Sequence, residues 1–185
     1  NTSFDFQELE SVSRTAARFL DDVVTINQFP TTKVKEAVDL TRKTGLGVMG
    51  WHDCLIRLGI DYDSEEALTL GSDVMQCINE AARDVSINLA KDRGAYPGWQ
   101  VTDMDPNPIR NATRTCIAPT GTISAIAGAS SGIEPIFALA FVKNVLDGRT
   151  LTEVNVDFER VAKERGFYSE ELMAEVAKTG SCQNI

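Results

Sequence analysis

The sequence predicts an α/β protein with a helix-rich first half and a β-rich second half. Two observations predict this fold class. Apolar residues recur at helical spacing over most of residues 1–95, whereas residues 113–118 and 133–145 form two apolar runs of the β type. The second run is long and almost wholly apolar, as expected of a strand that is buried on both faces.

Four amphipathic helices are expected in the first half. Their apolar stripes cover residues 6–26, 34–41, 48–59 and 63–94, with Asp5 and Asp63 as N-terminal caps and Gly45, Gly59 and Gly94 as C-terminal residues. A run of closely spaced glycines comprises Gly45, Gly47 and Gly50. No strand precedes it and its spacing does not complete the glycine motif of a dinucleotide-binding site, so we interpret these glycines as positions of close helix packing. His52 is the one histidine, and we expect it at the surface, away from the apolar stripe of its helix.

The second half begins after a proline-containing surface connection at residues 96–108. After the two β-type runs, Asp147-Gly148 indicates a hairpin whose returning strand covers residues 151–156. Two short helices are expected at residues 158–165 and 169–178. Ser169 is the N-cap candidate of the second, and Gly180 lies beyond its end.

A turn rich in hydroxyls lies between the two β-type runs and is the most informative part of the chain. It consists of Pro119, Thr120, Gly121, Thr122, Ile123 and Ser124. Phosphate oxygens are bound by converging donors, and a helix N-terminus supplies free N–H groups and a positive dipole end. In an extended or turn conformation the alternating hydroxyls of Thr120, Thr122 and Ser124 lie on one side. We interpret the turn as a candidate phosphate-binding segment without the lysine of a Walker sequence; the alternative is a capped helix start after a buried strand.

Glu134 follows a second turn rich in serine and glycine, residues 130–132, at the start of the second β-type run. A buried carboxylate is costly unless it is paired, so this position needs partners. Glu134 either orders the candidate phosphate segment or caps backbone N–H groups of the serine-rich turn.

Composition excludes several classes of function. The net charge is −9, with acidic and basic residues interspersed, so no nucleic-acid surface is expected. No apolar stretch reaches the roughly 18 residues of a membrane span and no signal-peptide pattern begins the chain, so we expect a cytoplasmic protein. The four cysteines lack paired spacing and are expected to be reduced, mostly buried thiols rather than metal ligands, with Cys116 a small core residue.

Residues 110–141, RNATRTCIAPTGTISAIAGASSGIEPIFALAF, resemble the phosphate-binding segment of the catalytic subunit of ribonucleotide reductase, of the adenosylcobalamin-dependent class II type. Further blocks resemble the same family in the same order: residues 4–6 with 18–24, then 45–50, 88–94 and 179–185. The resemblance therefore covers almost the whole chain.

For the fold, the resemblance implies part of the ten-stranded α/β barrel of ribonucleotide reductase. Residues 1–185 would form one partial domain, mainly helical over 1–95 and composed of strands, the phosphate loop and short helices over 109–185. The chain would be an internal to C-terminal fragment of the barrel domain. A piece of a closed barrel leaves strand edges unpaired, which invites homo-oligomerisation.

For the function, the resemblance implies reduction of a ribonucleoside di- or triphosphate to a deoxyribonucleotide by radical chemistry, with adenosylcobalamin as cofactor and a thioredoxin-like reductant. The family's Asn-Pro-Cys-Gly-Glu motif, which carries the radical cysteine and the base, is not among these residues. No catalytic residue is therefore expected in this chain, and the 185 residues alone should be inactive. The family's substrate-phosphate loop corresponds to the six residues from Pro119 to Ser124.

Two other interpretations stay open. The chain could belong to the large subunit of a class I reductase, which uses a metal-radical partner subunit. It could instead be a non-catalytic phosphate-binding or packing module that keeps the scaffold.

Overall fold

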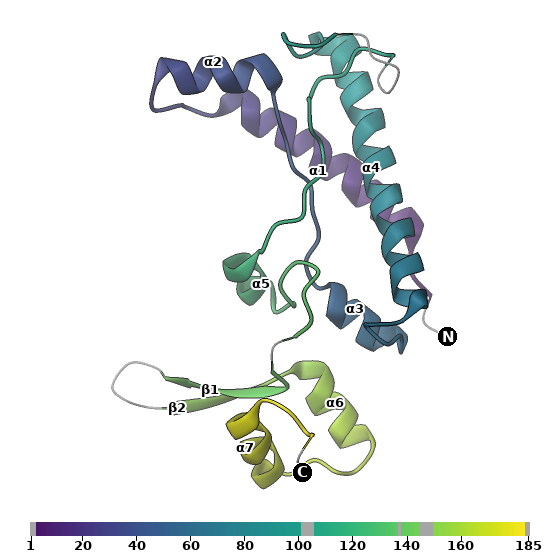
Figure 1. Cartoon of the computed structure of the whole chain (residues 1–185), viewed down its shortest axis with the longest axis vertical. Helices are drawn as coiled ribbons and strands as arrows, with labels where there is room; N and C mark the ends of the chain where they lie inside the picture. Colours follow the sequence, from purple (N-terminus) through teal and green to yellow (C-terminus); the bar gives the residue numbers. More distant parts are fainter. Residues whose placement is uncertain (1–2, 101–105, 137, 145–149, 184–185) are drawn as a thin grey trace. The chain divides into compact units, whose positions relative to one another are not determined.

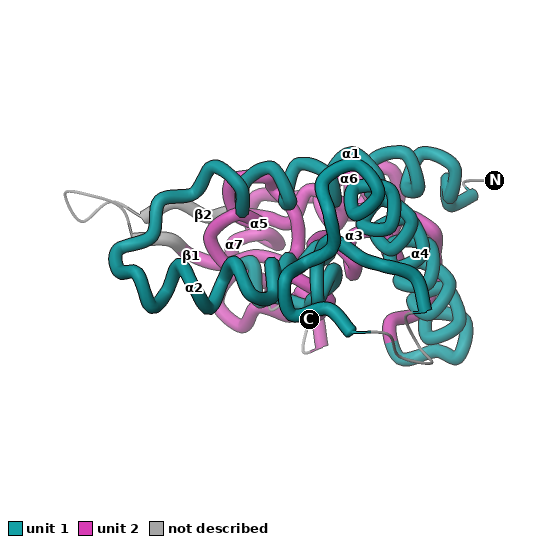
Figure 2. Tube along the Cα trace, turned by 90° about the horizontal axis from the view of Figure 1, so that it is seen from above, with its two compact units in different colours: residues 1–48, 63–120 teal, residues 49–62, 121–185 magenta. Residues whose placement is uncertain are grey.

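The computed structural model describes residues 3–100, 106–136, 138–144 and 150–183 (Figure 1). They fall into two compact units: unit 1 contains residues 1–48 and 63–120, and unit 2 contains residues 49–62 and 121–185 (Figure 2). Each unit is thus built from two separate stretches of the chain. None of the helices in the described ranges is long and apolar enough to cross a membrane.

Unit 1 is built around three helices, α1 (Phe6–Ile26), α2 (Thr32–Thr41) and α4 (Glu65–Arg93). α1 packs against α4, and the two helices cross in Figure 1. The side chain of Asp5 accepts a hydrogen bond from Glu8 N at 2.9 Å, which confirms the predicted start of the first helix. The long helix ends at Gly94 as predicted, but Ser64 rather than Asp63 caps its start.

The end of the second helix differs from the prediction, which placed it at Gly45. α2 ends at Thr41, and Arg42 takes the left-handed conformation there, with φ +43°. The guanidinium of Arg42 explains this, since its Nη2 donates to Asp21 Oδ1 and to Thr25 Oγ1, each at 2.8 Å. These bonds offset the cost of a left-handed residue other than glycine, which is about 1–2 kcal/mol.

A buried polar cluster around Asp21 joins the elements of unit 1. Asp21 is fully buried, and its carboxylate accepts hydrogen bonds from Arg42, from Arg93 at 3.1 Å and from Asn111 at 2.9 Å. The Nε atom of Arg110 lies 3.6 Å from Asp21 Oδ1. Burial alone would raise the pKa of Asp21, but the hydrogen bonds from Arg42 and Asn111 and the nearby positive charges hold it below its ordinary value. An ionised carboxylate therefore ties α1, α4 and the segments that follow α2 and α4 to one point.

The first predicted strand, residues 113–118, is not a regular strand: its described residues form one isolated parallel bridge, between Thr115 and Leu46. Gly45 and Gly47 lie against Cys116 and permit this pairing. They do not serve the close packing of helices that was expected for them. A Cβ on Gly47 would lie 2.3 Å from the carbonyl oxygen of Cys116. Cys116 is exposed, which corrects its assignment to the core.

Among its described residues, unit 2 contains the helices α3 (Trp51–Leu58), α5 (Gly121–Ala127), α6 (Val156–Glu164) and α7 (Glu170–Thr179), and the strands β1 (Ala140–Asn144) and β2 (Thr150–Val154). The strands are antiparallel, in a register that runs from Ala140 opposite Val154 to Asn144 opposite Thr150. α7 packs against both strands, and α3 contacts α6 (Figure 1). Residues from these elements form the apolar core of the unit: Leu55, Ala140, Ala162, Met173 and Val176.

The predictions for the end of the chain are confirmed. The strand expected after the hairpin is β2, and the two expected short helices are α6 and α7. Ser169 caps α7, and Gly180 takes the left-handed conformation at its end, with φ +75°. The predicted turn at Asp147-Gly148 lies outside the described residues.

The second β-type run is a strand only near its end, although the pattern predicts one over residues 133–145. Residues 133–136 belong to no strand, and β1 begins at Ala140. Pro135 has no N–H group to donate to a neighbouring strand. The carbonyl of Ile133 instead accepts a hydrogen bond from Tyr62, which follows α3. The N–H of Ile136 donates to His52, in the first turn of α3.

Candidate phosphate-binding segment

The candidate segment consists of the two residues before α5 and the first four residues of that helix. It comprises Pro119, Thr120, Gly121, Thr122, Ile123 and Ser124, and we call it the 119–124 segment. Thr120 has φ +54°, which is uncommon for a residue with a side chain, and α5 begins at the next residue. A Cβ built on Gly121 meets no atom within 4 Å. The space beside Gly121 is therefore open, at a helix start whose first N–H groups have no partner within the helix.

The expectation that Thr120, Thr122 and Ser124 present their hydroxyls on one side is wrong for the last two. Residues two apart in an α-helix are turned by about 200° relative to each other. Thr122 is exposed, whereas Ser124 is 2% exposed. The hydroxyl oxygen of Ser124 lies 2.9 Å from that of Ser131. Thr122 thus lies on the exposed side of α5, and Ser124 joins α5 to the loop that follows it.

That loop, residues 129–136, is fixed by α3 and by Tyr62. Gly50 N donates to Ser130 O at 2.7 Å, and Ser130 N donates to Asp53 Oδ2 at 2.6 Å, so both polar groups of one residue are bound. The hydroxyl of Tyr62 donates to the carbonyl of Ile133 at 2.8 Å. We call this segment the 129–136 loop.

His52 is the fourth residue that holds the 129–136 loop. Its Nδ1 accepts a hydrogen bond from Ile136 N at 2.8 Å, and its ring meets the ring of Tyr62 edge-on at 5.1 Å. His52 is half-buried, which corrects its expected place on the surface. Burial lowers its pKa below the ordinary value, although the neighbouring charge of Asp53 acts in the opposite direction.

Sequence patterns could not reveal these contacts, because each bond joins residues far apart in the chain. One signal was available for Asp53. It stands at the third position of α3 after Gly50, where an acidic side chain is stabilised by the positive end of the helix dipole.

Glu134 is placed in the 129–136 loop with an exposed side chain. Its N–H donates to Ser131 O at 3.0 Å, which closes the serine-rich turn through the backbone. Its carboxylate makes no hydrogen bond or ion pair with any residue that the structure describes. A role in ordering the 119–124 segment stays a prediction.

The comparison with known protein families decides the assignment. The family model described as "Ribonucleotide reductase, barrel domain" matches residues 1–107 and 101–185. This chain belongs to the ribonucleotide reductase barrel-domain family. The family resemblance read from the sequence is confirmed, and with it the fold of the reductase barrel domain.

Individual relatives give the same result. The chain is 52% identical over 183 residues to the vitamin B12-dependent ribonucleoside-diphosphate reductase of Thermoplasma acidophilum, which covers 98% of this chain and 24% of that protein. It is 49% identical over 177 residues to the protein of the same description from Mycobacterium tuberculosis, with 95% of this chain and 25% of that protein covered. The chain thus spans about a quarter of the length of these relatives.

A solved structure extends the likeness to three dimensions. The class Id ribonucleotide reductase alpha subunit of Actinobacillus ureae matches with a TM-score of 0.74 at 25% identity, over 94% of this chain and 32% of that one. The barrel-domain fold of this chain therefore follows from sequence and structure alike.

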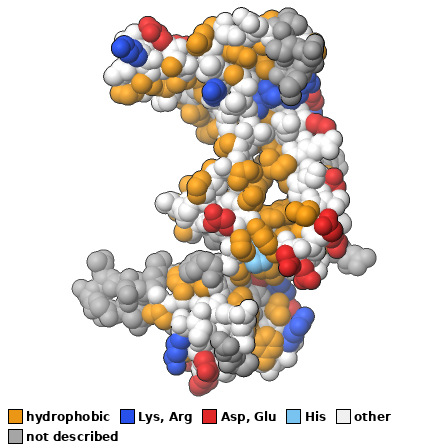
Figure 3. Space-filling model, viewed as in Figure 1, with side chains coloured by type: hydrophobic (Ala, Val, Ile, Leu, Met, Phe, Trp, Pro, Cys, Tyr) orange, Lys and Arg blue, Asp and Glu red, His pale blue; other side chains and the backbone are white. Residues whose placement is uncertain are grey.

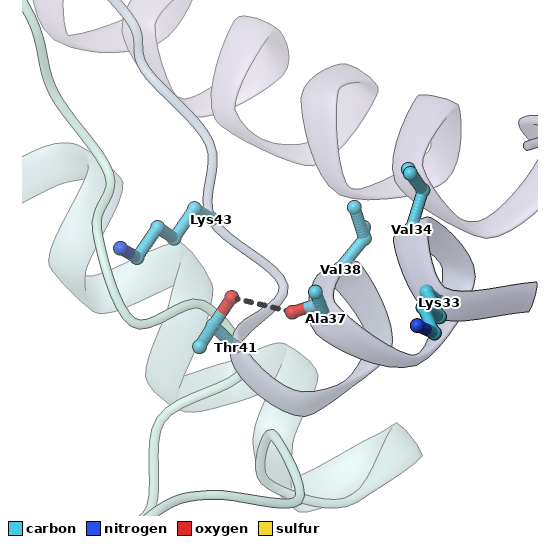
Figure 4. A pocket seen from close by; sticks show the side chains of 6 residues that line it. All are labelled: Lys33, Val34, Ala37, Val38, Thr41 and Lys43. Atoms are coloured by element: carbon cyan, nitrogen blue, oxygen red, sulfur yellow. Dashed lines mark hydrogen bonds between the residues drawn. The ribbon is translucent and has the colours of Figure 1, made fainter. Parts of the chain in front are cut away.

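Unit 1 has a hollow of about 460 Å³ on α2, and no residue of the 119–124 segment lines it. It is lined by Lys33, Val34, Ala37, Val38, Thr41 and Lys43 (Figure 4). Exposed apolar side chains also gather over α1 and α2 in Figure 3. The hollow contains no carboxylate or histidine, and the described residues hold no group of three or more His, Cys, Asp or Glu side chains placed to bind a metal ion.

The bond from Ile136 to His52 predicts a dependence of stability on pH. A protonated imidazole carries hydrogen on both nitrogens, so it cannot accept the Ile136 N–H. Because the folded pKa of His52 is lowered, the stabilisation is fully present above the unfolded value of about 6.5 and is lost as the pH falls through the folded value. Urea unfolding between about pH 7 and pH 5 should show a falling free energy of unfolding.

The control is His52→Asn, whose amide oxygen can accept the same N–H without titrating. This variant should show a flatter pH dependence than the unmodified protein. Equal slopes in the two proteins would mean that other groups cause the acid sensitivity.

Proposed function

We propose that this chain acts as a segment of a ribonucleotide reductase that reduces ribonucleoside diphosphates with adenosylcobalamin as cofactor, and that its 119–124 segment binds the substrate phosphates. The names and identities of the relatives support the cobalamin-dependent class. The two relatives described as vitamin B12-dependent share 52% and 49% identity with the chain. A relative described as a ribonucleoside-diphosphate reductase subunit alpha, from Chlamydia pneumoniae, shares 30%.

For the architecture, we propose that residues 1–185 form one partial domain within the ten-stranded α/β barrel. The helical part, residues 1–95, would supply outer helices, and residues 109–185 would contribute strands, the phosphate loop and short helices. A thioredoxin-like protein would return electrons to the complete enzyme.

The described residues do not fit a cobalamin site. The one histidine uses Nδ1 to accept the Ile136 N–H, and the hollow on α2 offers lysine, threonine and aliphatic side chains. We therefore place the cofactor on other parts of the complete reductase and derive no step through it.

The contribution of this chain is to hold the substrate. The single observation that carries the proposal is the start of α5, where a Cβ on Gly121 would meet open space and Thr122 is exposed. N–H groups at a helix start bind phosphate oxygens through hydrogen bonds and through the dipole. Held phosphates fix the position of the ribose, and alignment of reacting groups contributes about 7–11 kcal/mol in favourable cases.

Thr122→Val tests this proposal in the full-length reductase that carries the chain. Loss of a hydroxyl donor to a phosphate costs about 1–3 kcal/mol, so we expect kcat/KM for cytidine diphosphate to fall roughly 10- to 100-fold. Turnover should require adenosylcobalamin and a dithiol. Activity that needs a separate radical subunit instead would place the enzyme in class I.

Thr69→Val is the matched control, because the hydroxyl of Thr69 is exposed on α4 and bonds to Glu65 O within that helix. It should leave kcat/KM unchanged. Thr122→Val should also leave the weak use of cytidine, which lacks phosphates, unchanged. Equal losses for cytidine and cytidine diphosphate would show that Thr122 has no phosphate-binding role.

A further inference from the structure

Two buried aspartates of unit 2 have different surroundings. Asp157 is 4% exposed and pairs with Arg57 at 3.0 Å and with Arg160 at 3.3 Å, as a structural ion pair does. Asp53 is 7% exposed, and its Oδ2 accepts the backbone N–H of Ser130 at 2.6 Å. The buried charge of Asp53 is thus directed at the 129–136 loop.

Asp53 and Gly50 together fix the peptide groups of Ser130. Gly50 caps α3 with φ +76°, a conformation that favours glycine, and its N–H donates to Ser130 O at 2.7 Å. Asp53 lies in the first turn of the same helix, where the positive end of the dipole stabilises its charge. Ser130 is therefore held at both its N–H and its carbonyl by one rigid element.

The next residue carries this constraint to α5. Ser131 Oγ lies 2.9 Å from Ser124 Oγ, and Ala129 N donates to Ser124 O at 2.9 Å. Ser124 is 2% exposed and is the fourth residue of α5. Both neighbours of Ser130 thus contact the same residue of the helix that begins with Gly121.

We propose that Asp53 is a positioning residue for the substrate phosphates: by fixing Ser130 it orients α5 through the contact between Ser131 and Ser124. The inference rests on the proposed phosphate-binding function of the 119–124 segment. Asp53 does not touch the substrate, and it acts by holding the first turn of α5 in the orientation that receives the phosphates.

The test is the steady-state kinetics of Asp53→Ala in the full-length reductase, with cytidine diphosphate as substrate. We expect KM to rise about three- to tenfold while kcat changes by less than about twofold, because loss of one hydrogen bond disturbs binding and leaves the chemistry intact. Asp53→Asn should restore KM, since its amide oxygen can accept the Ser130 N–H. Asp157→Asn is the matched control: it should lower the melting temperature and leave KM unchanged.

A double variant separates positioning from a general loss of structure. If Asp53 acts through Ser124, Asp53→Ala combined with Ser124→Ala should raise KM no more than the larger single change does. Additive effects would overturn the proposal. Ser131→Ala provides a second route if Asp53→Ala does not fold, and an unchanged KM in Ser131→Ala would also overturn it.

The outcomes distinguish this inference from the proposed function. If Thr122→Val raises KM and Asp53→Ala does not, the positioning role is wrong and the phosphate segment stands. If neither variant raises KM, phosphate binding by the 119–124 segment is wrong, and the positioning role is wrong with it.

Discussion

Replacing Asp21 with alanine should destabilise unit 1 by about 3–5 kcal/mol, which is a large part of the stability of a typical domain. The change removes a fully buried carboxylate and leaves the guanidinium of Arg42, itself 7% exposed, without its buried partner. Arg93 and Arg110 lose the same carboxylate. Removal of one partner from a buried charged cluster costs more than the cluster contributes as a whole, because the remaining charges stay buried.

Urea unfolding measures this effect, with Asp84→Ala as the control. Asp84 pairs with Arg14 at 2.9 Å, but both side chains are exposed, so its loss should cost less than about 1 kcal/mol. Similar losses for the two variants would show that the Asp21 cluster contributes no more than a surface ion pair.

Gly121→Val should lower kcat/KM for cytidine diphosphate roughly 100-fold or more in the full-length reductase, since misplacement of a substrate by about 1 Å has an effect of this size. The structure indicates that this substitution should impair phosphate binding without disturbing the fold. A Cβ at Gly121 meets no atom within 4 Å, and Gly121 is not among the residues with positive φ, so the fold has room for the side chain. A phosphate bound at the start of α5 would instead collide with the valine side chain.

The melting temperature is the necessary companion measurement for Gly121→Val. It should change little, because the valine side chain points into open space. A large fall in melting temperature would assign the loss of activity to misfolding. Unchanged kcat/KM would show that phosphate does not approach α5 at Gly121.

The elements that local patterns control could be predicted from the sequence. α1, α3, α4 and the two C-terminal helices follow from apolar spacing, from capping side chains such as Asp5 and Ser169, and from Gly59, Gly94 and Gly180 at their ends. These signals act over three or four residues, and a sequence shows them directly.

The elements that depend on distant contacts could not be predicted. α2 ends at Thr41 because Asp21, far back in α1, binds the next residue, Arg42. Residues 133–136 leave the strand pattern because Tyr62 and His52 bind their backbone. Apolar periodicity carries no information about either partner.

The residue types of the 119–124 segment were enough to predict it as a candidate site, but they did not predict its conformation. Alternating hydroxyls suggested an extended turn, whereas Ser124 is turned inward by the start of α5 and bonds to Ser131. The residues that hold the neighbouring loop, Gly50, His52 and Asp53, stood in a stretch interpreted as a packing helix. Their role depends on Ser130 and Ile136, which lie far along the chain.

The central claim is that the start of α5 binds the phosphates of the substrate, and a structure of the full-length reductase with bound cytidine diphosphate tests it most directly. The account predicts a phosphate oxygen within about 3.2 Å of a backbone nitrogen of Gly121, Thr122 or Ile123, with the hydroxyl of Thr122 as a further donor. Phosphates held elsewhere in the enzyme, with no contact to the 119–124 segment, would contradict it.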